Sequence, residues 1–317
     1  MSNDLVDRVA AIDCGTNSIR LLVADVDPEA ATLTDLDRRM EIVRLGQGVD
    51  RTGRIAPEAL ERTLAACRRF AAVISDLGAT RTRMVATSAS RDAENAADFV
   101  RGVRDTLGLE PEVVSGDEEA ALSYAGATRE LASHPEVTPP YLVVDIGGGS
   151  TELVRAAGGG VVARSVDVGS VRLTERHFAD DPPTEAQISA ATRDADAALV
   201  LAAQVVPLDG VGTLVGVAGS VTTIGGIALE LPAYDRERVH HSRMTADRVH
   251  EITENLLRMA HADRAAMTVI HPGRVDVIAA GALILDRVVR YTGVTEVLVS
   301  EHDILDGMAW SLVERSR

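Results

Sequence analysis

The stretch Ile12-Asp13-Cys14-Gly15-Thr16-Asn17-Ser18-Ile19-Arg20-Leu21-Leu22 decides the fold, because a second stretch further along the chain matches it. Val144-Asp145-Ile146-Gly147-Gly148-Gly149-Ser150-Thr151-Glu152-Leu153-Val154 can be laid over it residue by residue. In both, an apolar run ends in an aspartate, a turn of small residues follows, and a second apolar run begins. Short apolar runs bounded by glycine are typical of buried strands. We therefore expect two copies of one strand–turn–strand unit, one in each half of the chain.

Strands and helices alternate along the rest of the sequence. The pattern predicts strands over residues 9–13, 19–26, 32–43, 83–86, 112–114, 141–146, 152–156, 161–168, 214–217 and 296–299. It predicts helices over residues 57–77, 92–107, 117–131, 185–205, 220–229, 246–259 and 275–289, and a final helix from residue 304. Such alternation indicates an α/β protein with a partly parallel sheet.

The length of 317 residues suggests two domains. Three prolines, Pro135, Pro139 and Pro140, interrupt residues 133–140, and a helix cannot continue through them. We therefore predict an N-terminal domain over residues 1–132 and a C-terminal domain over residues 133–317. The final helix is an element that could pack back on the first domain.

Charge and composition exclude several classes of function. The chain has 48 acidic and 32 basic residues, a net charge of −16, and every basic residue is an arginine. The negative field disfavours nucleic acid as a partner, and the absence of lysine excludes a Walker A lysine and Schiff-base chemistry. Two cysteines form no disulfide framework, and we find no signal peptide and no membrane-spanning run. We expect a soluble cytoplasmic protein.

The two glycine turns have the composition of phosphate-binding loops. Glycine lets successive backbone N–H groups face one anion, and short hydroxyl and amide side chains add donors at the same place. The aspartates cannot bind phosphate, so Asp13 and Asp145 are better interpreted as ligands or water-orienting groups for Mg²⁺, which prefers oxygen. Two such turns facing each other across a cleft would hold a chain of phosphates between two domains.

These residues resemble the actin, hexokinase and Hsp70 superfamily and, within it, the exopolyphosphatase/guanosine pentaphosphate phosphohydrolase (Ppx/GppA) family. The resemblance covers roughly residues 8–310 in the expected order. Beyond the two turns it rests on Gly46-Gln47-Gly48-Val49, on residues 86–95, on Ser115-Gly116-Asp117-Glu118-Glu119-Ala120, on Gly169-Ser170-Val171-Arg172-Leu173-Thr174 and on Pro272-Gly273-Arg274-Val275-Asp276-Val277.

The resemblance implies two actin-like (ribonuclease H-like) domains, each with a mixed sheet flanked by helices. It implies a hydrolase that removes terminal phosphate from inorganic polyphosphate with Mg²⁺, or with Mn²⁺ as the alternative ion. By position, Glu119 corresponds to the family's general base, and Asp145 and Glu152 to its metal-linked and water-linked acids. With Asp13, these two acids form the expected metal site. The expected phosphate-binding residues are Gly15, Thr16, Asn17, Ser18, Arg20, Arg91, Gly147, Gly148, Gly149, Ser150, Thr151, Gly219 and Ser220.

Three other functions remain open on the sequence. Hydrolysis of the 5′ phosphate of guanosine pentaphosphate (pppGpp) would use the same site. An ATP-dependent kinase of the actin-like superfamily and a non-catalytic sensor of polyphosphate or (p)ppGpp are further alternatives. The resemblance also implies a homodimer as one possible assembly, but no stretch of the sequence establishes it. Longer family members carry C-terminal helical domains, so a chain stopping near Arg317 suggests a preference for short polyphosphate.

Some candidate residues have a simpler interpretation. Glu118 and Glu119 point about 100° apart at a helix start, and we interpret Glu118 as first-turn charge. His240 and His241 would point apart on a strand, without a third ligand at useful spacing, so we interpret them as surface or hinge histidines. For Arg274 a phosphate contact and an ordinary helix-start position are equally good interpretations. The stretch from Ser300 to Gly307 is more acidic than the family pattern, so contacts at that edge are expected to differ.

Overall fold

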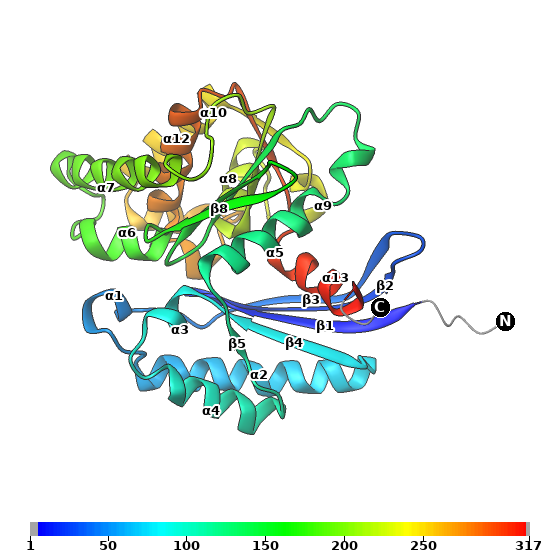
Figure 1. The fold of residues 1–317 in the computed structure, drawn as a ribbon. Coiled ribbons are helices and arrows are strands. Elements are labelled where there is room, and N and C mark those ends of the chain that lie inside the picture. Colours follow the sequence, from blue (N-terminus) through cyan, green and yellow to red (C-terminus); the bar gives the residue numbers. More distant parts are fainter. Residues whose placement is uncertain (1–5, 315–317) are drawn as a thin grey trace. The chain divides into compact units, whose positions relative to one another are not determined.

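The computed structural model describes residues 6–314, and its contacts divide the chain into two compact units. Unit 1 consists of Met1–Gly126 with Ile304–Arg317, and unit 2 consists of Ala127–Asp303 (Figure 1). The boundary predicted after residue 132 falls in η1 (Leu131–Ser133), shortly after the start of unit 2. The chain therefore enters unit 2 once, near residue 127, and leaves it once, near residue 303.

Unit 1 contains a five-stranded mixed sheet in the order β3-β2-β1-β4-β5. Antiparallel pairs join β1 to β2 and β2 to β3, whereas β1, β4 and β5 run parallel. The strands are β1 (Asp7–Cys14), β2 (Ser18–Asp27), β3 (Thr32–Ile42), β4 (Arg81–Ala86) and β5 (Glu112–Val113).

Helices cover both faces of this sheet, because the side chains of its central strands alternate between two apolar faces. On one face Ile12 and Leu21 pack in the same cluster as Phe70 and Phe99 of α2 and α4. On the other face Trp310 of α13 packs in a separate cluster with Val9 and Leu22 of the sheet, so the last described helix belongs to unit 1 (Figure 1). The helices are α1 (Val49–Thr52), α2 (Pro57–Leu77), α3 (Ser88–Asp92), α4 (Ala96–Leu107), α5 (Gly116–Thr128) and α13 (Ile304–Glu314).

Unit 2 repeats the same topology with one additional strand. Its order, β10-β11-β9-β6-β7-β8, contains β8-β7-β6-β9-β11, which corresponds to the order in unit 1 strand for strand. The strands are β6 (Tyr141–Ile146), β7 (Thr151–Ala157), β8 (Gly160–Val166), β9 (Thr213–Val217), β10 (Arg243–Thr245) and β11 (Glu296–Val299). The duplication predicted from the two aligned stretches is therefore present in the whole sheet.

The helices of unit 2 pack around one apolar cluster. Leu142 and Leu153 of the sheet share this cluster with Leu199 of α7 and Leu285 of α12. The helices are α6 (Ser170–His177), α7 (Glu185–Ala203), α8 (Ala218–Ala228), α9 (Arg236–Val239), α10 (Ala246–Arg258), α11 (His261–Ala266) and α12 (Ile278–Thr292), with the 3₁₀ turn η2 (Pro272–Arg274). Among the residues described, no helix is long and apolar enough to cross a membrane.

The predicted strands and helices are confirmed within a few residues, with one exception. The single helix predicted over residues 92–107 is two helices, α3 and α4, separated at Ala93–Asn95. The side chain of Asn95 accepts a hydrogen bond from Ile55 N–H (2.8 Å) and donates one to Ile55 O (3.1 Å). This pairing between residues distant in sequence keeps residues 93–95 out of a continuous helix, which the local sequence does not predict.

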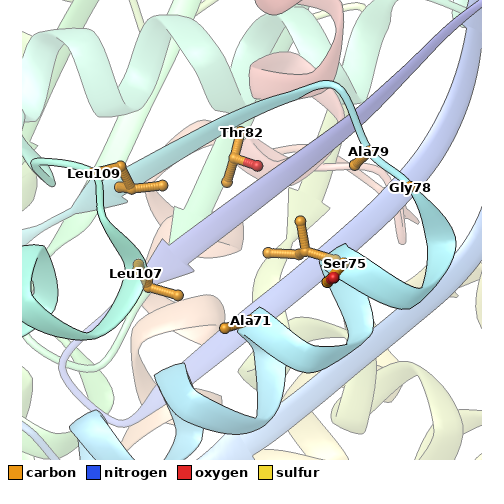
Figure 2. A pocket seen from close by; sticks show the side chains of 8 residues that line it. Ala71, Ser75, Gly78, Ala79, Thr82, Leu107 and Leu109 are labelled. Carbon is orange, nitrogen blue, oxygen red and sulfur yellow. The ribbon is translucent and has the colours of Figure 1, made fainter.

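A pocket in unit 1 lies at the amino-terminal end of β4, between α2 and the end of α4 (Figure 2). Its polar side chains are two hydroxyls, and none is titratable. It adjoins the first residues of β4, whereas the turn after Asp13 lies beside the last residues of β4. The lining residues are Ala71, Ile74, Ser75, Gly78, Ala79, Thr82, Leu107 and Leu109.

One glycine of α13 permits close packing in unit 1. A Cβ at Gly307 would lie 2.0 Å from the carbonyl oxygen of Leu122 in α5. We expect Gly307→Ala to lower the free energy of unfolding by about 1–3 kcal/mol, despite alanine's better helix propensity. Gly160→Ala is the matched control, since open space surrounds that position, and it should change stability by less than about 0.5 kcal/mol. Chemical denaturation followed by fluorescence of Trp310, the one tryptophan in the chain, measures both. Equal effects would contradict the packing argument.

Candidate functional site

Each sheet carries one short turn between its first two strands, and the two turns are closed by the same hydrogen bond. Gly15 N–H donates to Ser18 O over 3.0 Å, and Gly147 N–H donates to Ser150 O over 3.0 Å. Asp13 and Asp145 occupy the penultimate positions of β1 and β6. The predicted strand–turn–strand units are thus equivalent in structure as well as in sequence.

Parallel strands bring the candidate residues of unit 1 to one edge of the sheet. Cys14 pairs with Ala86, and Ala86 pairs with Val113, so the carboxyl ends of β1, β4 and β5 lie in line. This edge is where open α/β sheets bind their ligands. Thr87 N–H donates to Cys14 O (3.2 Å), and the hydroxyls of Thr16 and Ser88 are 2.8 Å apart. The turn and the segment before Arg91 are therefore held together.

Asp13 forms a buried ion pair with Arg20. The two residues lie directly opposite each other in β1 and β2, and Asp13 is only 5% exposed. Arg20 donates to Asp13 Oδ2 from Nε (3.0 Å) and from Nη2 (2.7 Å). The guanidinium compensates the buried carboxylate. The metal role predicted for Asp13 and the phosphate role predicted for Arg20 stay predictions, because neither ligand is present to test them.

Glu119 lies in the first turn of α5, and Arg91 holds its carboxylate. Arg91 Nη1 donates to Glu119 Oε2 (3.3 Å) and to the carbonyl of Val114 (3.1 Å). Glu119 is 9% exposed. Glu118 turns the other way and pairs with Arg83 at 3.0 Å, with 43% of its side chain exposed. The predicted divergence of the two glutamates is confirmed, and Arg91 and Glu119, both candidates from sequence, are in direct contact.

In unit 2, two acids face each other where unit 1 has an acid and an arginine. Asp145 lies opposite Glu152 in β6 and β7, at the positions equivalent to Asp13 and Arg20. Both are buried, Asp145 at 6% exposure and Glu152 at 0%. Ser165 of β8 donates to Glu152 Oε1 over 2.7 Å. Like charges directly across a ladder repel, and a divalent cation with oxygen ligands would compensate both.

Backbone contacts fix the turn after Asp145. Ser170 N–H donates to Gly147 O (2.9 Å) and Val171 N–H to Gly148 O (2.8 Å), so the start of α6 binds the carbonyls of the turn. A Cβ at Gly169 would lie 2.5 Å from Gly148 O, which explains glycine there. Thr151 is buried and its hydroxyl donates to Val168 O over 2.6 Å. For the Thr151 hydroxyl, the predicted phosphate contact therefore competes with this buried hydrogen bond to Val168 O.

A third turn follows β9, which runs parallel to β6 with Val217 opposite Asp145. Ala218 begins α8 with φ of 66°, a left-handed conformation rare for alanine. Gly219 comes next, and the Arg274 guanidinium covers it so closely that a Cβ there would lie 1.6 Å from Nη1. The turn containing Gly219 and Ser220 thus shares a sheet edge with Asp145. Arg274, for which two interpretations were open, packs on this turn.

Sequence reasoning missed two polar partners of the candidate residues. Ser88 contacts Thr16, and it lies in the matched stretch over residues 86–95, where a run of small hydroxyl residues was a visible signal. Ser165 contacts Glu152, and only the register between β7 and β8 reveals it. Of the remaining predicted residues, Asn17, Gly149 and Ser150 lie in the two turns, and Ser18 begins β2.

Two duplicated units of this strand order, each with an acid before a small-residue turn, define a protein of the actin-like class. A profile described as the Ppx/GppA phosphatase family matches residues 22–316. The chain belongs to the Ppx/GppA phosphatase family.

Individual relatives support this placement. Exopolyphosphatase 2 of Mycobacterium tuberculosis is 46% identical over 316 residues, covering 96% of this chain and 98% of that protein. A crystal structure of an exopolyphosphatase-like protein is 41% identical with a TM-score of 0.94, covering 98% of this chain and 99% of that one. The Aquifex aeolicus member of the Ppx/GppA family is 29% identical with a TM-score of 0.81, covering 98% of this chain and 99% of that one.

The ion pair in unit 1 predicts an asymmetric response to mutation. Arg20→Gln leaves the Asp13 carboxylate buried without its cation, so it should lower the free energy of unfolding by about 3–5 kcal/mol. The double variant Asp13→Asn/Arg20→Gln should be more stable than Arg20→Gln alone, because no buried charge remains. Urea denaturation of the wild type, both single variants and the double variant forms the cycle. A double variant less stable than Arg20→Gln would contradict the pairing.

Proposed function

We propose that this chain is an exopolyphosphatase that hydrolyses the terminal phosphoanhydride of inorganic polyphosphate with Mg²⁺. The observation that carries the proposal is the buried Glu119 carboxylate, held by Arg91 at the sheet edge where the Asp13 turn also lies. Family membership and the names of two relatives support polyphosphate as the substrate. The same names favour polyphosphate over pppGpp, and neither a kinase nor a sensor is favoured by any contact described above.

The proposed chemistry assigns Glu119 to the attacking water. Hydrolysis of a phosphoanhydride needs a water aligned with the bond that breaks, and a group that orients or deprotonates that water. One Glu119 oxygen accepts a hydrogen bond from Arg91, which restrains the carboxylate. The guanidinium of Arg91 is also a suitable partner for phosphate oxygens. Arg91 therefore connects the water-orienting group to the substrate.

The acids of unit 2 fit a divalent cation. Asp145 and Glu152 are buried opposite each other, and Ser165 orients Glu152 by its hydrogen bond. Oxygen donors of this kind suit Mg²⁺, with Mn²⁺ as the alternative. A bound ion would supply charge neutralisation for the phosphoryl group. Asp13 is the weaker metal candidate, because Arg20 already compensates its charge.

The turns supply the remaining phosphate contacts in this proposal. Backbone N–H groups of Thr16 and Asn17 and of Gly148 and Gly149 would bind phosphate oxygens without help from the overall field, which is negative, while the N–H groups of Gly15 and Gly147 close the turns. That the two units act on one polyphosphate chain across a cleft stays a prediction. So do the cytoplasmic location, the homodimer and the preference for short polyphosphate.

Glu119→Gln tests the water-orienting role. The amide keeps the size of the side chain but cannot take a proton, so phosphate release from polyphosphate should fall about 10²-fold or more while polyphosphate still binds. Glu118→Gln is the matched control and should retain wild-type turnover, since Glu118 pairs with Arg83. Malachite-green phosphate release measures turnover, and a filter assay with labelled polyphosphate measures binding. Wild-type turnover in Glu119→Gln would refute the assignment.

Asp145→Asn tests the metal role. The change removes one of two opposed carboxylates, so the Mg²⁺ concentration for half-maximal activity should rise at least about 10-fold. Asp13→Asn provides the comparison: a smaller shift is expected if Asp13 serves mainly as the partner of Arg20. The measurement is a Mg²⁺ titration of phosphate release at saturating polyphosphate. An unchanged titration for Asp145→Asn would argue against a metal between Asp145 and Glu152.

A further inference from the structure

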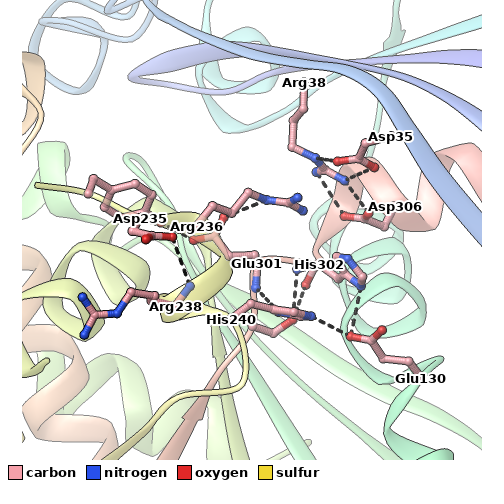
Figure 3. Close-up of polar contacts among 12 residues, drawn as sticks. Asp35, Arg38, Glu130, Asp235, Arg236, Arg238, His240, Glu301, His302 and Asp306 are labelled. Carbon is pink, nitrogen blue, oxygen red and sulfur yellow. Dashed lines mark hydrogen bonds and ion pairs between the residues drawn. The ribbon is translucent and has the colours of Figure 1, made fainter. Parts of the chain in front are cut away.

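Three histidines of unit 2 converge on one carboxylate oxygen, in an arrangement that the proposed hydrolysis does not use. Glu130 Oε1 lies 2.9 Å from His240 Nε2, 3.0 Å from His241 Nε2 and 3.1 Å from His302 Nδ1. Figure 3 shows Glu130 with its contacts to His240 and His302. We call Glu130, His240, His241 and His302 the histidine cluster.

The backbone explains why the adjacent histidines converge. We expected His240 and His241 to point apart, as neighbours on a strand do, and this prediction is wrong. His241 has a left-handed conformation, with φ of 58°, and its N–H donates to Val299 O over 2.8 Å. The two rings are consequently stacked, with centroids 3.8 Å apart and planes at 28°.

Glu130 and His240 are coupled electrostatically to their neighbours in the cluster. Burial opposes the Glu130 charge, but the three imidazoles outweigh it and hold the pKa of Glu130 well below its ordinary value. Burial lowers the pKa of His240, and this outweighs the opposite effect of Glu130.

The hydrogen bonds of the cluster leave one buried nitrogen unsatisfied. His240 Nε2 makes the hydrogen bond to Glu130 Oε1. His241 Nε2 is buried at a similar distance but lies outside hydrogen-bonding geometry with any group among the described residues. His241 Nε2 therefore faces the Glu130 carboxylate at 3.0 Å without the aligned hydrogen bond that His240 makes.

We propose that Glu130, His240 and His241 bind a divalent transition-metal ion of the zinc type. Donor atoms of these three residues all lie within 4.8 Å of one another. Two imidazoles and a carboxylate suit Zn²⁺ and its neighbours in the first transition row, whereas Mg²⁺ prefers oxygen alone. A fourth position would be taken by water or by His302. The site uses none of the residues assigned to Mg²⁺ above.

Binding has one identifiable cost. Glu301 N–H donates to His240 Nδ1 over 3.1 Å, which keeps the His240 proton on Nε2. Coordination through Nε2 moves that proton to Nδ1 and breaks the contact with Glu301. The loss of one backbone hydrogen bond is small against three metal–ligand bonds.

The site has a structural consequence that follows from chain order. Glu130 lies just after the chain enters unit 2 at Ala127, and His302 lies just before it leaves at Asp303. The side chains of His240 and His241 come from the connection between α9 and β10. Occupancy would therefore fasten the entry segment of unit 2 to the α9–β10 connection, and with His302 as the fourth ligand it would fasten the exit segment as well.

The test is Zn²⁺ binding by full-length protein without a histidine tag, stripped with chelator and held in millimolar Mg²⁺ to occupy oxygen sites. Isothermal titration should find one Zn²⁺ per chain, and Co²⁺ substitution should give visible absorption bands of a nitrogen-ligated ion. His241→Gln and Glu130→Gln should each weaken Zn²⁺ binding by more than about 100-fold. His261→Gln is the control, because that ring contacts Asp276 outside the cluster. Circular dichroism confirms that each variant is folded.

The outcomes are decisive in both directions. Wild-type binding that both cluster variants lose and His261→Gln retains supports the site. Absence of stoichiometric Zn²⁺ binding by the wild type overturns it. So does Zn²⁺ binding by His241→Gln and Glu130→Gln that is as tight as that of the wild type. Phosphate release with Mg²⁺ is measured separately, so failure of the metal site leaves the proposed hydrolysis standing, and the reverse also holds.

Discussion

A carboxylate buried at the end of a central strand needs a compensating positive charge, and this requirement organises both halves of the molecule. Unit 1 meets it within the chain, because Arg20 lies directly opposite Asp13 in the next strand. Unit 2 has Glu152 at the equivalent position, so Asp145 faces a second acid. The same sheet position thus carries an internal ion pair in one unit and, in the other, two opposed acids that we propose as cation ligands.

Sheet topology converts these strand positions into groups of functional residues. In unit 1 the parallel strands β1, β4 and β5 end at one edge, which places the Asp13 turn, Arg91 and Glu119 there. In unit 2, the parallel strands β6 and β9 do the same for Asp145 and Gly219. Helices pack on the faces and leave these edges to the loops. The candidate site residues are therefore distant in sequence, and a parallel sheet aligns them.

Much of this could be predicted from sequence because the relevant signals are local. Apolar runs revealed the strands, and the small residues after Asp13 and Asp145 revealed the turns. The opposite orientations of Glu118 and Glu119 followed from helix geometry alone. What escaped prediction depends on contacts across the fold: Asn95 breaks a helix by binding Ile55, and Ser165 reaches Glu152 only through strand register. The left-handed backbone of His241 similarly reverses an expectation that held only for a regular strand.

The most direct test of the central claim is a crystal structure with Mn²⁺ in place of Mg²⁺ and a slowly hydrolysed polyphosphate, with the ion located by its anomalous scattering. We predict that Mn²⁺ lies within ligand distance of the carboxylates of Asp145 and Glu152, with Asp13 still paired to Arg20. An ion bound away from both unit 2 acids, with those acids contacting only protein groups, would contradict the account.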